Sequence, residues 1–84
     1  MNKVVLEPVD VILRVKGLKT DVLKFRKGNT EYKVTKFIAS WVERVGDNII
    51  THYHLICGSQ AISCELSHNH LQNKWLLVQI DNID

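Results

Sequence analysis

The fold class of this 84-residue chain depends on residues 34–45, which read Val34-Thr35-Lys36-Phe37-Ile38-Ala39-Ser40-Trp41-Val42-Glu43-Arg44-Val45. Their apolar side chains fall at i, i+3, i+4, i+7, i+8 and i+11, which is the spacing of a helix stripe. However, five of the residues are β-branched, and Ala39-Ser40 is a place where a bulge can shift the face of a long strand. We predict a bent strand here, with a helix at residues 34–45 as the alternative.

The segments on either side of this stretch have the patterns of strands. Alternating or apolar runs occupy residues 9–16, 22–26, 30–34, 49–57, 61–66 and 74–80. Glycine and asparagine separate several of them, at Gly17, Gly28-Asn29 and Gly46-Asp47-Asn48, where tight turns need a positive φ. The last run is apolar on both faces, which is typical of a central strand or of the closure of a barrel. The sequence predicts an all-β fold, an antiparallel meander of about six strands in a strongly bent sheet or small barrel.

A chain of this length has room for one hydrophobic core, so we predict a single small β domain over residues 1–84. Its core is predicted from the inward-facing positions of the strands. These positions are Val11, Leu13, Val15, Leu23, Phe25, Tyr32, Val34, Trp41, Tyr53, Leu55, Ile62, Cys64, Leu66, Trp75 and Leu77.

The composition is ordinary for a globular domain, with 45% hydrophobic and 24% charged residues. No apolar run approaches the roughly 20 residues that a helix needs to cross a bilayer. The apolar run near the N-terminus is too short for a signal peptide. We therefore expect a cytoplasmic protein without membrane contact.

Four histidines and two cysteines carry the only metal-site or nucleophile chemistry that we single out. His52 and His54 project from one face of a strand, and His68 and His70 lie in a polar loop. Cys57 has the opposite parity to the first two histidines, and the chain has no Cys-x-x-Cys motif. We expect free buried thiols at Cys57 and Cys64, with the four histidines as weak zinc candidates. No serine or cysteine lies in a nucleophile motif, so we expect neither an enzyme nor a cofactor.

Basic residues gather in the first half of the chain. Residues 1–45 hold ten of the eleven Lys and Arg residues against five acids, for a net charge of +5, whereas residues 46–84 have a net charge of −3. Six basic side chains on the first three strands form a candidate nucleic-acid surface, namely Arg14, Lys16, Lys24, Arg26, Lys27 and Lys33. Lysines on a sheet also serve solubility and protect edges from aggregation, which is the alternative interpretation of the same residues.

Several different short motifs are spread over nearly the whole chain, from Glu7-Pro8 to Asp81. They are Leu23-x-Phe25-Arg26-x-Gly28-x-x-x-Tyr32-x-Val34, Phe37-Ile38-x-x-Trp41, Tyr53-His54-Leu55, Glu65-Leu66 and Trp75-x-Leu77-x-x-Ile80-Asp81. With these motifs the chain resembles an uncharacterised family of short bacterial β proteins, a domain of unknown function. Family members often have a tryptophan where Phe25 stands and an aromatic residue where Cys64 stands, and the family has no fixed histidine at the four candidate positions. Because some relatives are encoded near DNA-damage polymerase genes, the resemblance implies an accessory role and no reaction.

Two functions remain as expectations. The first is a small interaction module that docks on a protein partner, including a homodimer formed through a sheet edge or through Ile50, Ile56 and Val78. The alternative is a nucleic-acid-binding accessory, related to DNA repair, that uses the basic face of the N-terminal hairpin. The salt dependence of binding distinguishes the two functions. Affinity for nucleic acid falls steeply as ionic strength rises, whereas affinity at an apolar docking surface changes little.

Overall fold

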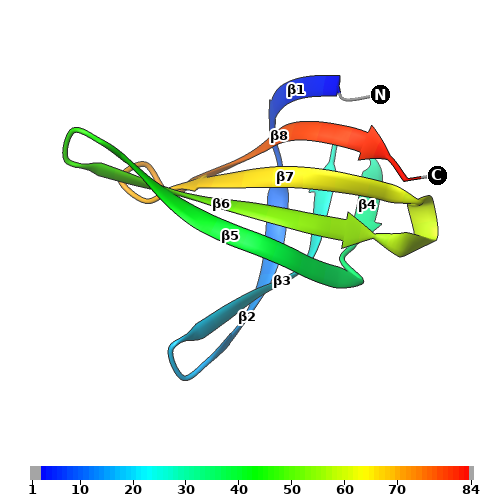
Figure 1. Ribbon diagram of the computed structural model, residues 1–84, viewed down its shortest axis with the longest axis horizontal. Helices are drawn as coiled ribbons and strands as arrows, with labels where there is room; N and C mark the ends of the chain where they lie inside the picture. Colours follow the sequence, from blue (N-terminus) through cyan, green and yellow to red (C-terminus); the bar gives the residue numbers. More distant parts are fainter. Residues whose placement is uncertain (1–2, 84) are drawn as a thin grey trace.

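The computed structural model describes residues 3–83, which form two antiparallel sheets and no α-helix (Figure 1). In chain order the strands are β1 (Lys3–Pro8), β2 (Asp10–Lys16), β3 (Lys19–Lys27), β4 (Thr30–Lys33), β5 (Lys36–Val45), β6 (Asn48–Cys57), β7 (Ile62–Asn69) and β8 (Lys74–Asn82), with a 3-10 helix η1 (Gly58–Gln60) before β7. One sheet has the order β1-β8-β7-β6-β5 and the other β2-β3-β4. The all-β prediction is confirmed, and the helix alternative at residues 34–45 is wrong, because β5 occupies that stretch.

Two corners connect the sheets, because β1 leads into β2 at Val9 and β4 leads into β5 through Val34 and Thr35. The Val9 amide donates to the carbonyl of Trp75 on β8 at 3.2 Å. At the second corner the Val34 amide donates to Leu23 on β3 at 3.0 Å, while the next amide, that of Thr35, donates to Ile56 on β6 at 2.8 Å. The sheets are therefore bent around one core, but no ladder joins them, so the predicted barrel is not closed.

The core lies between the two sheets. Phe25 on β3 is 1% exposed and faces Leu55, Leu66 and Leu77 of the five-stranded sheet, which are equally buried. Burying each side chain of this size stabilises the fold by about 1.5–3 kcal/mol. Tyr32 stacks on Phe25 with ring centroids 4.9 Å apart and extends the core towards β4. Burial of Phe25, Leu55, Ile62, Cys64, Leu66 and Leu77 agrees with the sequence-based core.

Four residues of the predicted core are exposed instead, namely Leu13, Val15, Leu23 and Trp41. On β3 the reason is a bulge, since Ile12 pairs with Lys24 but Leu13 pairs with Val22, which leaves Leu23 as the extra residue. Val22 therefore takes the buried position that alternation assigned to Leu23. Leu13 and Val15 lie on the β2–β3 hairpin, which extends away from the five-stranded sheet (Figure 1).

The strand count also differs from the expected six. β1 was not expected, and the bent strand predicted at residues 34–45 is separated from β4 by the corner at Val34 and Thr35 and begins only at Lys36. A bulge does occur next to Ala39, because Phe37 pairs with Leu55 and Ala39 pairs with His54, so that Ile38 is the extra residue. β8 lies between β1 and β7, as its apolar faces predicted for a central strand.

We expect the corner at Thr35 to contribute measurably to stability. Thr35 Oγ1 donates to the Ile56 carbonyl at 3.2 Å and accepts from the Gly58 amide at 2.8 Å, and a Cβ at Gly58 would lie 2.9 Å from this oxygen. Thr35→Val and Gly58→Ala should each lower the free energy of unfolding by about 1 kcal/mol, because both disrupt these bonds. Urea unfolding measures the change. The control Thr20→Val, on an exposed threonine, should stay within about 0.5 kcal/mol of the parent, and equal effects of all three variants would contradict the role of the corner.

Candidate functional site

The four candidate zinc histidines lie on opposite faces of the five-stranded sheet. His52 and His54 project from the face that is turned away from the core, whereas His68 pairs in register with Thr51 on the other face. There His68 stacks on Trp75 with ring centroids 4.2 Å apart, and His70 Nε2 lies 2.8 Å from Thr51 Oγ1. Within residues 3–83 no three His, Cys, Asp or Glu side chains are grouped so as to hold a metal ion.

The two cysteines are free and lie in the core, 0% and 2% exposed. A hydrogen bond to Cys57, together with burial, raises the pKa of the Cys64 thiol well above its usual value. A buried neutral thiol is a poor nucleophile, so Cys64 serves as a core side chain.

Acidic neighbours accompany most of the predicted basic surface. Four of its six residues form ion pairs, Arg14 with Asp21 at 3.1 Å, Lys24 with Glu31 at 3.4 Å, Arg26 with Asp10 at 3.2 Å and Lys27 with Glu7 at 3.7 Å. Lys16 and Lys33 have no ion pair with any described residue. The surface is thus a mixture of both signs, which lowers its attraction for phosphates.

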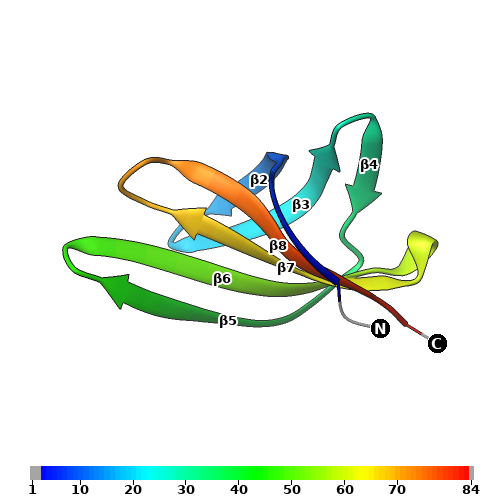
Figure 2. The same cartoon turned by 90° about the horizontal axis from the view of Figure 1, so that it is seen from above.

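The edges of the two sheets differ in how they are protected. β1 is interrupted by a register shift, by Leu6 at a φ of 52° and by Pro8, and β4 is only four residues long. β2 carries three charged residues, namely Asp10, Arg14 and Lys16. β5 is ten residues long and contains no proline, so its outer edge presents a long row of backbone groups without strand partners among the described residues. This strand lies outermost, beyond β6 (Figure 2).

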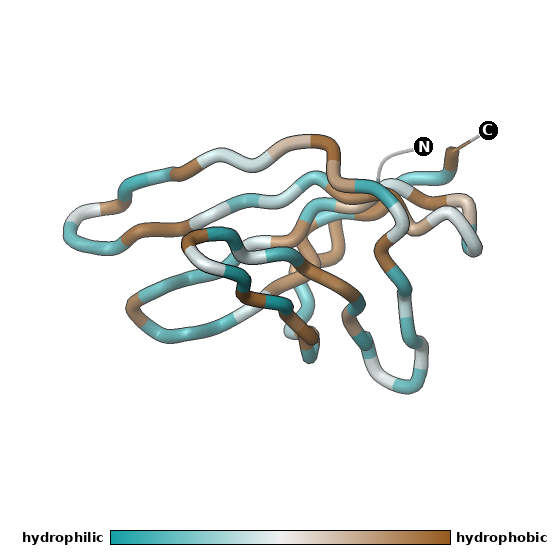
Figure 3. Tube along the Cα trace, turned by 90° about the horizontal axis from the view of Figure 1, so that it is seen from below, coloured by the Kyte–Doolittle hydropathy of each residue, from teal (hydrophilic) through white to brown (hydrophobic). Residues whose placement is uncertain are grey.

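β5 also exposes large apolar side chains on both faces. Phe37 and Val42, on the face turned towards the second sheet, are 57% and 61% exposed, and Trp41 on the opposite face is 45% exposed. Hydrophobic segments alternate with polar ones along this strand at the periphery of the molecule (Figure 3). Exposed apolar side chains beside an unpaired backbone edge are a template for another strand.

A groove lies beside this edge, between β5 and the β2–β3 hairpin. It has a volume of about 540 Å³ and is lined by Val22, Leu23, Phe37, Tyr53 and Leu55, among others. Charged side chains also line it, namely Arg14, Lys19, Asp21 and Lys36, so the groove between β5 and the second sheet is of mixed polar and apolar character.

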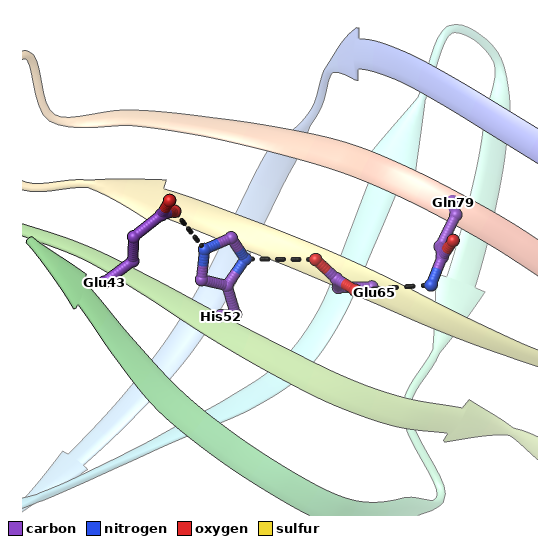
Figure 4. A network of polar contacts seen from close by, with 4 residues as sticks. All are labelled: Glu43, His52, Glu65 and Gln79. Carbon is purple, nitrogen blue, oxygen red and sulfur yellow. Dashed lines mark hydrogen bonds and ion pairs between the residues drawn. The ribbon is translucent and has the colours of Figure 1, made fainter. Parts of the chain in front are cut away.

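A polar network on the opposite face holds β5 to the centre of its sheet (Figure 4). The two ring nitrogens of His52 lie 3.0 Å from Glu43 on β5 and 3.0 Å from Glu65 on β7. Gln79 on β8 donates to the other oxygen of Glu65 at 3.3 Å. Trp41 lies flat on His52, with ring centroids 5.3 Å apart and an interplanar angle of 8°. Side chains from four strands thus keep β5 in a fixed position.

Sequence reasoning did not assign Phe37, Trp41 or Val42 to a site. The signal was present in the stripe of residues 34–45, which puts apolar side chains on both faces of a strand. A strand covered on one face alternates, so this pattern marked either a central strand or an exposed docking edge.

Comparisons of the chain with models of known families, with curated proteins and with solved structures give no match. Among the residues that the structure describes, no helix has the length and apolar character needed to cross a membrane.

Proposed function

We propose that this protein is a docking module that pairs the outer edge of β5 with an extended strand of a partner polypeptide. The observation that carries the proposal is the ten-residue edge of β5, with Phe37, Trp41 and Val42 exposed beside it. In strand addition the backbone edge supplies hydrogen bonds, and side chains on alternate positions supply specificity.

The side chains of β5 define the chemistry of the partner. Lys36 and Glu43 lie near the two ends of the strand, with apolar residues between them. A complementary strand therefore has apolar residues in its middle and opposite charges at its ends, because like charges directly opposite each other destabilise a ladder.

The network around His52 supports this role, because it holds β5 in place before the partner arrives. An edge that is already ordered loses less conformational entropy on binding than a mobile segment does.

Photo-crosslinking in the native cell tests the proposal. A benzoylphenylalanine in place of Ala39 on β5 should give a discrete adduct with a partner polypeptide, whereas the same residue in place of Leu71, which is exposed in the β7–β8 loop, should not. Val42→Asp should weaken the Ala39 adduct at least about tenfold, because it places a charge in the apolar pairing.

The matched control is Val4→Asp, since Val4 on β1 is as exposed as Val42. It should leave the adduct unchanged. Adducts of equal yield from Ala39 and Leu71, or an Ala39 adduct that Val42→Asp does not weaken, would contradict docking on β5.

For the nucleic-acid alternative we expect no binding, because acids compensate most of the basic surface. Fluorescence anisotropy with single- and double-stranded DNA at low and at physiological salt tests this. Binding at low salt that weakens when Lys24, Arg26 and Lys27 are all changed to glutamine, with a smaller salt slope for the variant, would establish the alternative instead.

A further inference from the structure

The bulge at Ile38 determines which residues of β5 share a face. Phe37 pairs with Leu55 and Val42 pairs with Thr51, so both project towards the second sheet although they are five positions apart. Regular alternation would have placed them on opposite faces. By the same shift Lys36 and Glu43, seven positions apart, both lie on the opposite face.

This arrangement makes β5 complementary to itself. In a two-fold antiparallel pairing of two sheets, each residue lies opposite a residue of the second copy that projects from the same face. We place the two-fold axis at Ser40 and leave Ile38 out of the count, because it is the extra residue of the bulge. The opposing residues are then Ser40 with Ser40, Ala39 with Trp41, Phe37 with Val42 and Lys36 with Glu43, and each pair except the first occurs twice.

We infer that the strand bound by the β5 edge is a second copy of this chain, paired antiparallel about Ser40 into one continuous sheet. The inference rests on the proposed docking function and names its partner. It places Lys36 of each copy opposite Glu43 of the other. Lys36 makes no ion pair with any described residue, and the Glu43 side chain is 54% exposed and uses only one carboxylate oxygen on His52.

The apolar residues match in the same register. Phe37 of one copy meets Val42 of the other on the groove side, where both are otherwise more than half exposed. Trp41 lies opposite Ala39 on the opposite face of the sheet.

Other two-fold registers lose this match. An axis at Trp41 places Lys36 opposite Val45 and Glu43 opposite Ala39, and an axis at Ala39 places Lys36 opposite Trp41. An axis at Glu43 places two carboxylates against each other, which is destabilising. Of these axes, only the one at Ser40 pairs Lys36 with Glu43 and also pairs Phe37 with Val42.

Exchanging the charges of Lys36 and Glu43, and measuring the dimer dissociation constant by sedimentation equilibrium, tests the register. The unmodified protein should dimerise. Lys36→Glu and Glu43→Lys should each weaken the dimer at least about tenfold, because each creates two like-charge pairs. The double variant should bind at least about threefold more tightly than either single variant, although less tightly than the parent because Glu43→Lys also removes the contact with His52. Lys74→Glu, at an exposed lysine on β8, should have no effect.

A cysteine at the axis provides a second, independent readout. Ser40→Cys should form an intermolecular disulfide on mild oxidation, because the Cα atoms of directly opposed residues lie about 4.5–5.5 Å apart, within the range that a disulfide spans. The buried Cys57 and Cys64 do not compete, and Ser59→Cys on η1 should form no intermolecular disulfide under the same oxidation.

The outcomes separate the two proposals. A dimer that the double variant does not restore and that Ser40→Cys does not crosslink would overturn the register. A protein that is monomeric at every concentration, yet gives the Ala39 adduct with another polypeptide in the cell, would overturn the second copy and leave docking intact. A monomer without any β5 adduct would overturn both.

Discussion

Two successive backbone amides, those of Val34 and Thr35, donate to strands of different sheets, and the rest of the structure depends on this change of partner. The first amide bonds to β3 at 3.0 Å and the second to β6 at 2.8 Å. The side chain of Thr35 adds a bond to each side of the β6–η1 junction. Because backbone groups that lack partners are costly to bury, these bonds determine where the chain leaves the small sheet.

The consequence is an edge strand with both faces exposed. β5 pairs with β6 but has no strand of the three-stranded sheet beside it, and the groove between β5 and the β2–β3 hairpin is open. Long apolar edges promote aggregation, and proteins usually protect them with prolines, charges or short strands, as β1 and β4 do here. β5 has charged residues near its ends and one bulge, but its ten-residue length and the exposed apolar residues in its middle are consistent with a surface that a partner strand covers.

The fold class could be predicted because its signals are local. Gly17, Gly28 and Gly46 have φ values near +60° at the turns where their glycines indicated hairpins. Burial could not be predicted in the same way, because Leu13 and Trp41 have the same alternation as Phe25 but no strand of the opposite sheet covers them. The bulges at Leu23 and Ile38 depend on pairing with distant strands, and the docking residues Phe37 and Val42 share a face only because of the second bulge.

Hydrogen exchange of the β5 amides, followed by NMR at two protein concentrations, tests the central claim most directly. We predict that amides of Lys36–Val45 that point away from β6 exchange with solvent in dilute protein and become protected as the concentration rises. The amides of β1, the opposite edge of the same sheet, should exchange equally at both concentrations. Exchange at the outer edge of β5 that does not change with concentration would contradict the pairing of two copies through this strand.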